Sequence, residues 1–337
     1  MSSAAPSVRA VRAGAQRRLL SGHMMRYALL IGLVAMEIGF ALKEPLTFSA
    51  TNLLNIVQQT SYLALFAAAQ MVVIITRGFD LSLGTCVSAI SVASALIMTR
   101  MVAHDPGTLP LAIILALLAG LAFGMLVGLF NGLCVSMLNV NPFITTLGSF
   151  NICLGIATTI SDGRPVFDVP KTFSHLLYSG TIFGVPAPVI ISICVLLICF
   201  AMLNGTVFGR SLYIMGGNPR AAQLAGLPAR RYLTLAYVMC SFLAAVGALM
   251  LTARTGSGEP NLGGNLTLQS IAAAVIGGVS LQGGTGGTLA AVIGALFVTC
   301  LANGMDLARV DGYVQQIVLG SVIIAAIFLD RLRASAS

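Results

Sequence analysis

Charged side chains are scarce in this sequence, and the shortage excludes a soluble globular fold. Asp, Glu, Lys and Arg make up 8% of the chain, while hydrophobic residues make up 57%. A soluble domain carries about 25% charged residues, because its surface has to remain in water. The chain instead has repeated apolar runs close to the roughly 20 residues that a helix needs to cross a bilayer. These features predict a polytopic membrane protein.

The residue sets of common catalytic and metal sites are also missing. The three histidines, His23, His104 and His175, are far apart and show no metal-ligand spacing. None of the seven cysteines forms a CxxC pair, and almost all lie in apolar runs, where a thiol is usually a small buried hydrophobe. The only Lys followed by Ser or Thr is Lys171, and Pro170 precedes it where a phosphate-binding loop requires Gly. We therefore predict no enzyme activity, no cofactor and no ATP hydrolysis by this chain alone.

The apolar runs are continuous and rich in Leu, Ile, Ala and Gly, which favours helices over the alternating strands of a barrel. A helix also satisfies its own backbone groups inside lipid. The predicted fold is all-α, a polytopic transmembrane helical bundle of about ten spans. The expected spans are residues 26–42, 52–76, 80–101, 110–138, 143–160, 188–204, 232–253, 268–282, 286–303 and 313–329.

The distribution of charge predicts the orientation of these spans. Basic residues in short loops stay on the cytoplasmic side of a membrane. With the N-terminus inside, most of the 18 basic residues fall on the inner side, so both termini are expected to be cytoplasmic. Residues 1–25 are expected to be a flexible basic tail, 26–330 a single transmembrane domain and 331–337 a second tail. This rule and anionic lipid explain the net charge of +8 without a nucleic-acid partner.

The longest basic inner loop, residues 205–231, contains a short helix signal in "GGNPRAAQLAGLPARRY" (216–232). Asn218 is a preferred N-cap, Pro219 suits the first helical position, and Gly226 suits the position after the last turn. The pattern predicts a helix of about two turns over residues 219–225. A helix this short is marginal in water, so it must pack on something.

Two interpretations of this helix remain open from the residues alone. It may simply be a cap on its own bundle. Alternatively, it offers a cytoplasmic partner a small apolar patch with a basic rim. The patch would consist of Ala221, Ala222, Leu224 and Leu227, and the rim of Arg220, Arg230 and Arg231.

Five collinear motifs resemble one family. The pattern GGN-x-x-AA-x-x-x-G resembles the coupling loop of bacterial carbohydrate-uptake ABC transporter permeases of the ribose, xylose and galactose type. "GFDLSLG" and "NPFITTLGSFNICLGI" are similar to two further elements of that family, as is "GSGEPNLGG" with "IAAAVIGGVSLQGGTGG". "ANGMDL" and "QQIVLG" complete the set. Arg77, Gln269 and Thr285 depart from residues that are frequent in the family.

The resemblance implies an inner-membrane permease subunit that works with cytoplasmic ABC ATPase subunits, an external sugar-binding protein and a second permease copy. It also implies alternating access driven by ATP hydrolysis in the partner subunits. The expected ATPase-coupling residues are Gly216, Gly217, Asn218, Ala221, Ala222, Leu224, Gly226, Arg230 and Arg231.

A sugar is a neutral polyol, so its pathway needs hydrogen-bonding groups and exposed backbone without strong fixed charge. The candidate pathway residues are Asp80, Ser82, Asn141, Phe143, Gly277, Gly278 and Ser280. Two of them also have structural explanations. The structural alternatives for Asp80 are a pair with Arg77 and a cap of the helix that begins at Leu81, and we favour the cap over sugar contact. Asn141 is most simply the N-cap of the fifth span.

Other functions share parts of this pattern. An ion-coupled secondary transporter would use a membrane carboxylate such as Asp80 or Glu37. An ABC permease for nucleosides or branched-chain amino acids would share much of the architecture. The outer loop 161–187 is either a surface connection or part of the dock for a binding protein. A weak likeness between "DLSLGT" and "VSLQGG" suggests an internal repeat.

Overall fold

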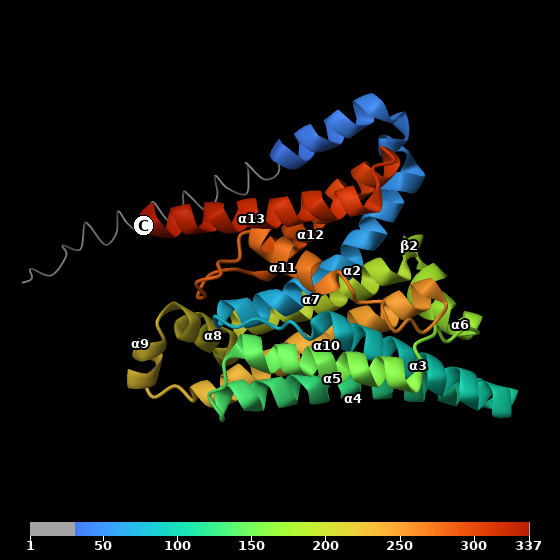
Figure 1. The fold of residues 1–337 in the computed structure, drawn as a ribbon, viewed down its shortest axis with the longest axis horizontal. Coiled ribbons are helices and arrows are strands. Elements are labelled where there is room, and N and C mark those ends of the chain that lie inside the picture. Colours follow the sequence, from blue (N-terminus) through green and yellow to red (C-terminus); the bar gives the residue numbers. More distant parts are fainter. Residues whose placement is uncertain (1–30, 337) are drawn as a thin grey trace, which may run out of the picture.

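The computed structural model describes residues 31–336, which form a helical bundle with one small hairpin (Figure 1). Residues 31–43 are helical. The α-helices that follow are α2 (Ala50–Ile75), α3 (Leu83–His104), α4 (Leu109–Ser136), α5 (Pro142–Ile160), α6 (Lys171–Ser174), α7 (Ala187–Gly205), α8 (Val207–Gly217), α9 (Pro219–Leu224), α10 (Ala229–Thr255), α11 (Leu266–Ile276), α12 (Thr288–Leu307) and α13 (Gly312–Ala336). Short turns η1 (Pro45–Phe48), η2 (Pro106–Thr108) and η3 (His175–Ser179) and antiparallel strands β1 (Thr181–Ile182) and β2 (Val185–Pro186) complete the chain.

The all-α membrane fold is confirmed. In the described range, seven helices are long and apolar enough to cross a membrane: α2, α3, α4 with η2, α5, α7, α10 and α12. The expected span 268–282 is wrong as a continuous helix, because α11 ends at Ile276 and Gly278 takes a left-handed φ of 108°. The total of about ten spans stays a prediction. The expected tail 1–25 lies outside the described residues, and α13 continues through Ala336.

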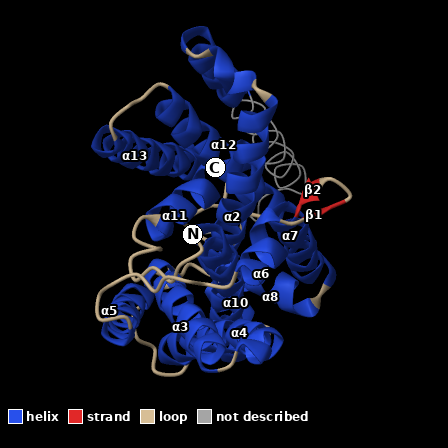
Figure 2. Cartoon of the chain, turned by 90° about the vertical axis from the view of Figure 1, so that its right-hand side faces the viewer, coloured by secondary structure: helices blue, strands red, loops and turns tan. Residues whose placement is uncertain are grey.

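The centre of the bundle is α2, which packs against α10 and α12, while α10 also packs along α4 (Figure 2). Close approach of α4 and α10 depends on small residues. A Cβ added at Gly124 would lie 2.7 Å from the Ala245 Cβ, and one added at Gly132 would lie 2.8 Å from the Thr234 Cα. With Gly128 between them, these glycines are spaced by four residues and therefore share one helix face, which permits backbone contact between membrane helices.

An irregular segment, residues 257–265, joins α10 to α11 and packs along α3. The Glu259 amide donates to Ser91 Oγ at 3.2 Å, and the Gly263 amide donates to Ser88 Oγ at 3.0 Å. The Gly84 amide in turn donates to Thr267 Oγ1 at 3.0 Å. Side-chain hydroxyl groups therefore accept hydrogen bonds from backbone amides that have no partner in a regular helix or sheet in this region.

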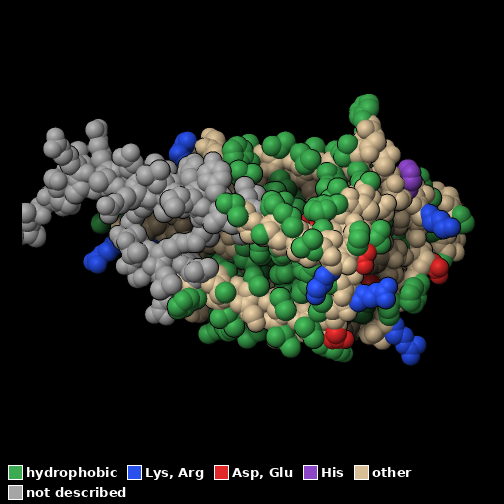
Figure 3. All heavy atoms as spheres, turned by 90° about the horizontal axis from the view of Figure 1, so that it is seen from above, with side chains coloured by type: hydrophobic (Ala, Val, Ile, Leu, Met, Phe, Trp, Pro, Cys, Tyr) green, Lys and Arg blue, Asp and Glu red, His purple; other side chains and the backbone are tan. Residues whose placement is uncertain are grey.

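The two ends of the bundle differ. Helix α9 lies at one end together with the C-terminus of α13, while α6 and the β hairpin lie at the other (Figure 1). In the view from above, charged side chains lie mainly toward the two ends, and the middle carries mainly hydrophobic side chains (Figure 3). This arrangement suits a molecule whose middle contacts lipid and whose ends contact water.

Candidate functional site: a coupling element and an amide-lined pocket

Helix α9 has the caps that its sequence predicts. Asn218 Oδ1 accepts a hydrogen bond from the Ala221 amide at 3.0 Å, and Pro219 occupies the first helical position. Gly226 follows the last turn with a left-handed φ of 68°. These local signals fix both ends of the helix, because each satisfies backbone groups that the short helix leaves unpaired.

The two faces of α9 differ in exposure. The Ala222 side chain is buried, with 1% of its surface exposed, and α9 packs against α8. Leu224 is 85% exposed, and Ala221 is exposed as well. The apolar patch expected from the sequence is therefore wrong at Ala222, because that side chain faces its own chain. One side of α9 is therefore a cap on its own bundle, and the use of the exposed side by a partner stays a prediction.

Exposed basic residues lie on α9 and soon after it in the sequence. They are Arg220 on the helix and Arg230 and Arg231 at the start of α10. Leu224 is therefore an exposed apolar side chain with basic residues on either side of it in the sequence. Such an anchor with a polar rim is a common pattern at protein interfaces.

Arg77 joins the transmembrane helices to this element. Its Nε donates to the Gly216 carbonyl at 2.5 Å, and its Nη2 donates to the Gly217 carbonyl at 2.9 Å. These carbonyls belong to the last turn of α8, where the helix dipole favours a cation. Arg77 itself lies directly after α2 and has a left-handed φ of 66°. The sequence identified Arg77 as a departure from the family pattern and as a possible partner of Asp80, and it did not predict the contact with α8.

The loop between α11 and α12 packs into the same junction. The Gly284 amide donates to the Ile75 carbonyl at 2.8 Å, and a Cβ added at Gly284 would lie 2.6 Å from the Gly217 Cα. Tyr213 donates to the Gly286 carbonyl at 3.2 Å. Burial raises the pKa of the Tyr213 hydroxyl, which keeps it protonated as a donor. Three segments therefore meet at the base of α9: the end of α2, the end of α8 and the loop 277–287.

Asp80 is the centre of a second, buried group. One carboxylate oxygen accepts from the Ser82 amide at 2.9 Å and from Ser82 Oγ at 2.5 Å. Gln70 Nε2 donates to the Asp80 carbonyl at 2.6 Å, Asn131 Nδ2 donates to Ser82 Oγ at 3.0 Å, and Ser149 donates to Asn131. This group of Gln70, Asp80, Ser82, Asn131 and Ser149, which we call the Asp80 network, joins α2, α4 and α5 to the segment before α3.

The burial of the Asp80 network corrects two predictions. Asp80 is 1% exposed and Ser82 is 0% exposed, so neither contacts a solute in this conformation. The expected pairing of Asp80 with Arg77 is also wrong, because the Arg77 side chain binds the end of α8. Helix α3 begins at Leu83 rather than Leu81, and Asp80 lies in the turn before it. The structural explanation is the one that the geometry favours.

The other candidate pathway residues are not brought together. Asn141 accepts from the Phe143 amide at 2.9 Å and is the N-cap of α5, while Phe143 is 55% exposed. Gly277 allows α11 to approach the Ala290 carbonyl of α12, where a Cβ would overlap. Gly278 and Ser280 lie in the loop that follows α11. In the described structure these residues therefore do not form a single site.

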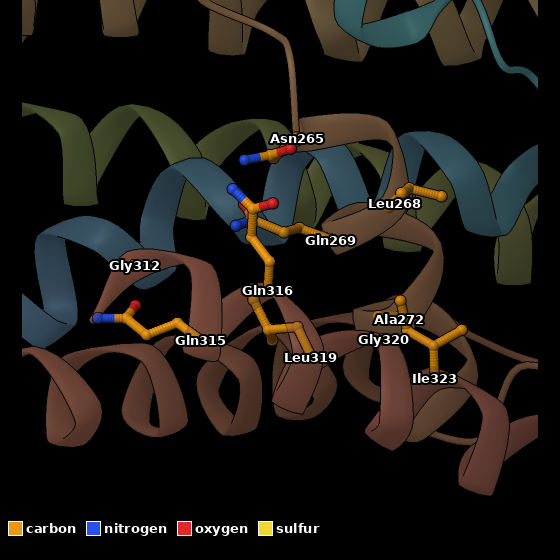
Figure 4. Close-up of a pocket in the computed structure, with 10 residues that line it drawn as sticks. All are labelled: Asn265, Leu268, Gln269, Ala272, Gly312, Gln315, Gln316, Leu319, Gly320 and Ile323. Atoms are coloured by element: carbon orange, nitrogen blue, oxygen red, sulfur yellow. The ribbon is translucent and has the colours of Figure 1, made fainter. Parts of the chain in front are cut away.

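A pocket of about 300 Å³ lies between α11 and α13 (Figure 4). The sequence analysis did not select it, although four amide side chains near apolar helices were a usable signal. The lining residues are Asn265, Leu268, Gln269, Ala272, Gly312, Gln315, Gln316, Leu319, Gly320 and Ile323. None of them is charged.

The chain resembles transport permeases over nearly its whole length. The family described as branched-chain amino acid transport system / permease component matches residues 52–327. The ribose import permease protein RbsC of Bacillus subtilis is 32% identical over 95% of this chain and 97% of its own. RbsC of Escherichia coli K12 is 34% identical over 94% and 96%, and the galactose/methyl galactoside import permease protein MglC of that strain is 33% identical over 91% and 93%. No solved structure gives a significant match.

These similarities define the class of the protein as a multi-pass membrane permease. The chain belongs to the family described as branched-chain amino acid transport system / permease component. It is a permease subunit of the ABC importer class rather than an enzyme, and ATP hydrolysis resides in a separate subunit. The resemblance that the motifs predicted is confirmed.

Proposed function

We propose that this chain is the membrane-spanning permease subunit of an ATP-driven sugar importer in a bacterial inner membrane. The observation that carries the proposal is the near full-length similarity to permeases named for ribose, allose and galactose import. The family description also covers branched-chain amino acids. The names of these relatives support the sugar branch over the amino acid and nucleoside alternatives.

Helix α9 is the element that we assign to the ATPase partner. Leu224 is the apolar anchor, and the exposed Arg220, Arg230 and Arg231 form its rim. Gly216, Gly217, Asn218 and Gly226 shape the helix and its attachment, and Ala222 holds it to the protein. The sugar-binding protein would dock at the opposite end, where Phe183 in the β hairpin is 102% exposed. Because one chain supplies one α9, a two-site ATPase implies a second permease copy.

Movement of α9 has a direct route into the membrane domain. The end of α8 is bonded to Arg77, and the neighbouring Ile75 carbonyl is bonded to Gly284. A shift of α9 therefore acts on the ends of both α2 and the loop before α12. ATP binding in the partner changes the conformation only if the partner binds the two conformations with different affinity. We expect movement of the partner to reach the transmembrane helices through the junction around Arg77.

The test compares Leu224→Arg with Phe183→Arg, two equal changes at exposed apolar residues on opposite ends. Permease, ATPase and binding protein are expressed together, and both complex formation and ATP-dependent sugar uptake are measured. Leu224→Arg is expected to lower ATPase recovery with the permease by about tenfold or more, as loss of an interface anchor does. Phe183→Arg is expected to retain the ATPase and to lower uptake only.

Two results would contradict the proposal. If Leu224→Arg retains the ATPase at the wild-type level, α9 is not the coupling element. If uptake by the wild-type chain follows an ion gradient and does not depend on ATP, the importer assignment is wrong. Wild-type Ala222 should not be changed in this experiment, because its substitution would disturb the packing of α9 on its own chain.

A further inference from the structure

The pocket between α11 and α13 has a polar side and an apolar side. Asn265 and Gln269 come from the start of α11, and Gln316 comes from the first turns of α13. Figure 4 shows these three amides gathered on one side. Leu268, Ala272, Leu319 and Ile323 supply carbon atoms on the other side. The volume of about 300 Å³ is at the lower limit of pockets that bind small molecules.

The fourth amide is already occupied. Gln315 Nε2 donates to Asp306 Oδ1 at 2.7 Å and to the Val310 carbonyl at 3.0 Å, which fixes the turn between α12 and α13. The side chains of Asn265, Gln269 and Gln316 have no hydrogen-bond partner among the described residues. Each carries two N–H donors and a carbonyl acceptor. The pocket therefore presents donors and acceptors together and no fixed charge.

This combination selects a class of ligand. A hydroxyl group both donates and accepts, so several amides can bind neighbouring hydroxyl groups of one molecule. The apolar side can cover the C–H face of a sugar ring. An ion or a zwitterionic amino acid would need a charged partner, because an unpaired charge is costly away from water. The lining fits a neutral polyol better than either.

The location also fits a step in transport. The C-terminus of α13 lies at the end that carries α9, so the first turns of α13 lie toward the end that carries α6 and the hairpin (Figure 1). This is the half of the molecule that would face an external binding protein. The Asp80 network, in contrast, is sealed inside the protomer.

We propose that Asn265, Gln269 and Gln316 form a subsite that holds a monosaccharide as it passes through the permease. The subsite rests on the proposed sugar-import function and deepens it by naming the residues that contact the sugar. It replaces Asp80 and Ser82 as the expected contacts.

The experiment uses the complete complex of permease, ATPase and binding protein in proteoliposomes. Uptake of D-ribose, D-allose and D-galactose is measured alongside ATP hydrolysis for Gln269→Leu, Gln316→Leu and the milder Gln269→Asn. Asn151→Leu is the matched control, because Asn151 is exposed on α5 and its amide donates only to the Leu147 carbonyl of the same helix. Thermal stability in detergent and the permease dimer content are measured for every variant.

The two leucine variants are expected to lower the sugar transported per ATP by about tenfold, because they leave sugar hydroxyls unpaired in the pocket. Gln269→Asn should recover part of the loss, and Asn151→Leu should stay within about twofold of wild type. Stability, dimer content and ATP hydrolysis should remain normal in all four. A change in the preference among the three sugars would support the subsite as well.

Unchanged uptake in both leucine variants would overturn the subsite. A loss of dimer that parallels the loss of uptake would overturn it too, because the pocket would then be an interface between two copies of the chain. Failure of the wild-type complex to take up any of the three sugars is a different result. It would overturn the proposed function and the subsite with it, whereas wild-type uptake with unaffected variants overturns the subsite only.

Discussion

The two helix breaks of the bundle satisfy backbone inside the membrane domain by different chemistry. Both follow a helix with a left-handed residue, Arg77 after α2 and Gly278 after α11. The first break, residues 76–82, is closed by side chains of the Asp80 network. The second, residues 277–287, is closed by glycines that bring backbone against backbone. "DLSLGT" and "VSLQGG" fall in corresponding places, which agrees with the suggested internal repeat.

The difference indicates what each break does. Side chains from three helices hold the first break, so its geometry depends on many contacts and is fixed by them. The second break lies against the ends of α2 and α8, where the Gly284 amide bonds the Ile75 carbonyl and the Tyr213 hydroxyl bonds the Gly286 carbonyl. The first break is therefore the rigid member of the pair. The second is the surface across which movement of α9 is transmitted.

The largest effect is expected from Gly284→Ala, which breaks the contact between the second loop and α8. The new Cβ would lie 2.6 Å from backbone atoms of Gly217, and φ at this position is 74°. Strain and overlap together should cost about 3 kcal/mol of unfolding free energy. Gly226→Ala is the control, because its φ is 68° but nothing lies within 4 Å. Equal melting temperatures for the two variants in detergent would refute the contact.

The next effect is expected at the first break. Asp80→Ala leaves the Ser82 amide and hydroxyl without their acceptor and should destabilise the protein by about 2 kcal/mol. Asp80→Asn retains an acceptor oxygen and should be milder. Thermal unfolding and sugar uptake are measured for both. If Asp80→Asn folds normally but transports as poorly as Asp80→Ala, the carboxylate has a role in transport that the burial of Asp80 does not predict.

Arg77→Met tests the connection between the breaks and the coupling element. Two hydrogen bonds to α8 carbonyls are lost, and because Arg77 is exposed the stability should fall by only about 1 kcal/mol. Coupling should suffer more, with sugar transported per ATP reduced about fivefold. Arg254→Met, at the opposite end where Arg254 lies over the Tyr62 ring, is the control. Normal coupling in Arg77→Met would rule out this route.

The smallest effect is expected from Tyr213→Phe. It removes one hydrogen bond from Tyr213 to the second break, worth about 1 kcal/mol or less, and keeps the ring. Melting temperature is the measurement, and Tyr213→Ala gives the scale of losing the ring as well. If the Phe variant is as unstable as the Ala variant, the hydroxyl contributes far more to stability than one hydrogen bond, which contradicts the prediction.

Local features of the fold were predictable from the sequence. The apolar runs predicted the helices. Asn218 and Gly226 predicted the ends of α9, and the glycines of α4 predicted its contact face. Each of these signals acts within a few residues of the chain, through hydrogen bonding, permitted φ or side-chain size. They needed no knowledge of where other segments lie.

The site was predictable only in part, because its contacts join distant segments. The bond from Arg77 to Gly216 spans 139 residues, and Asn131 and Ser149 complete the Asp80 network from other helices. The inward face of Ala222 depends on where α8 lies. The amide pocket needs α11 and α13 to be adjacent. No local pattern contains this information, so exposure and pairing had to come from the structure.

The hydroxyl groups of α3 that receive the segment 257–265 also constrain how the protein is made. Ser91 accepts from Glu259 across 168 residues of sequence, and Ser88 accepts from Gly263 across 175. Nearly half of the chain is therefore synthesised after α3 and before the polar face of α3 meets its partner. During that interval α3 must remain beside water, the insertion machinery or another helix. The packing of α3 is therefore completed late in biogenesis, after the segment that follows α10 has been synthesised.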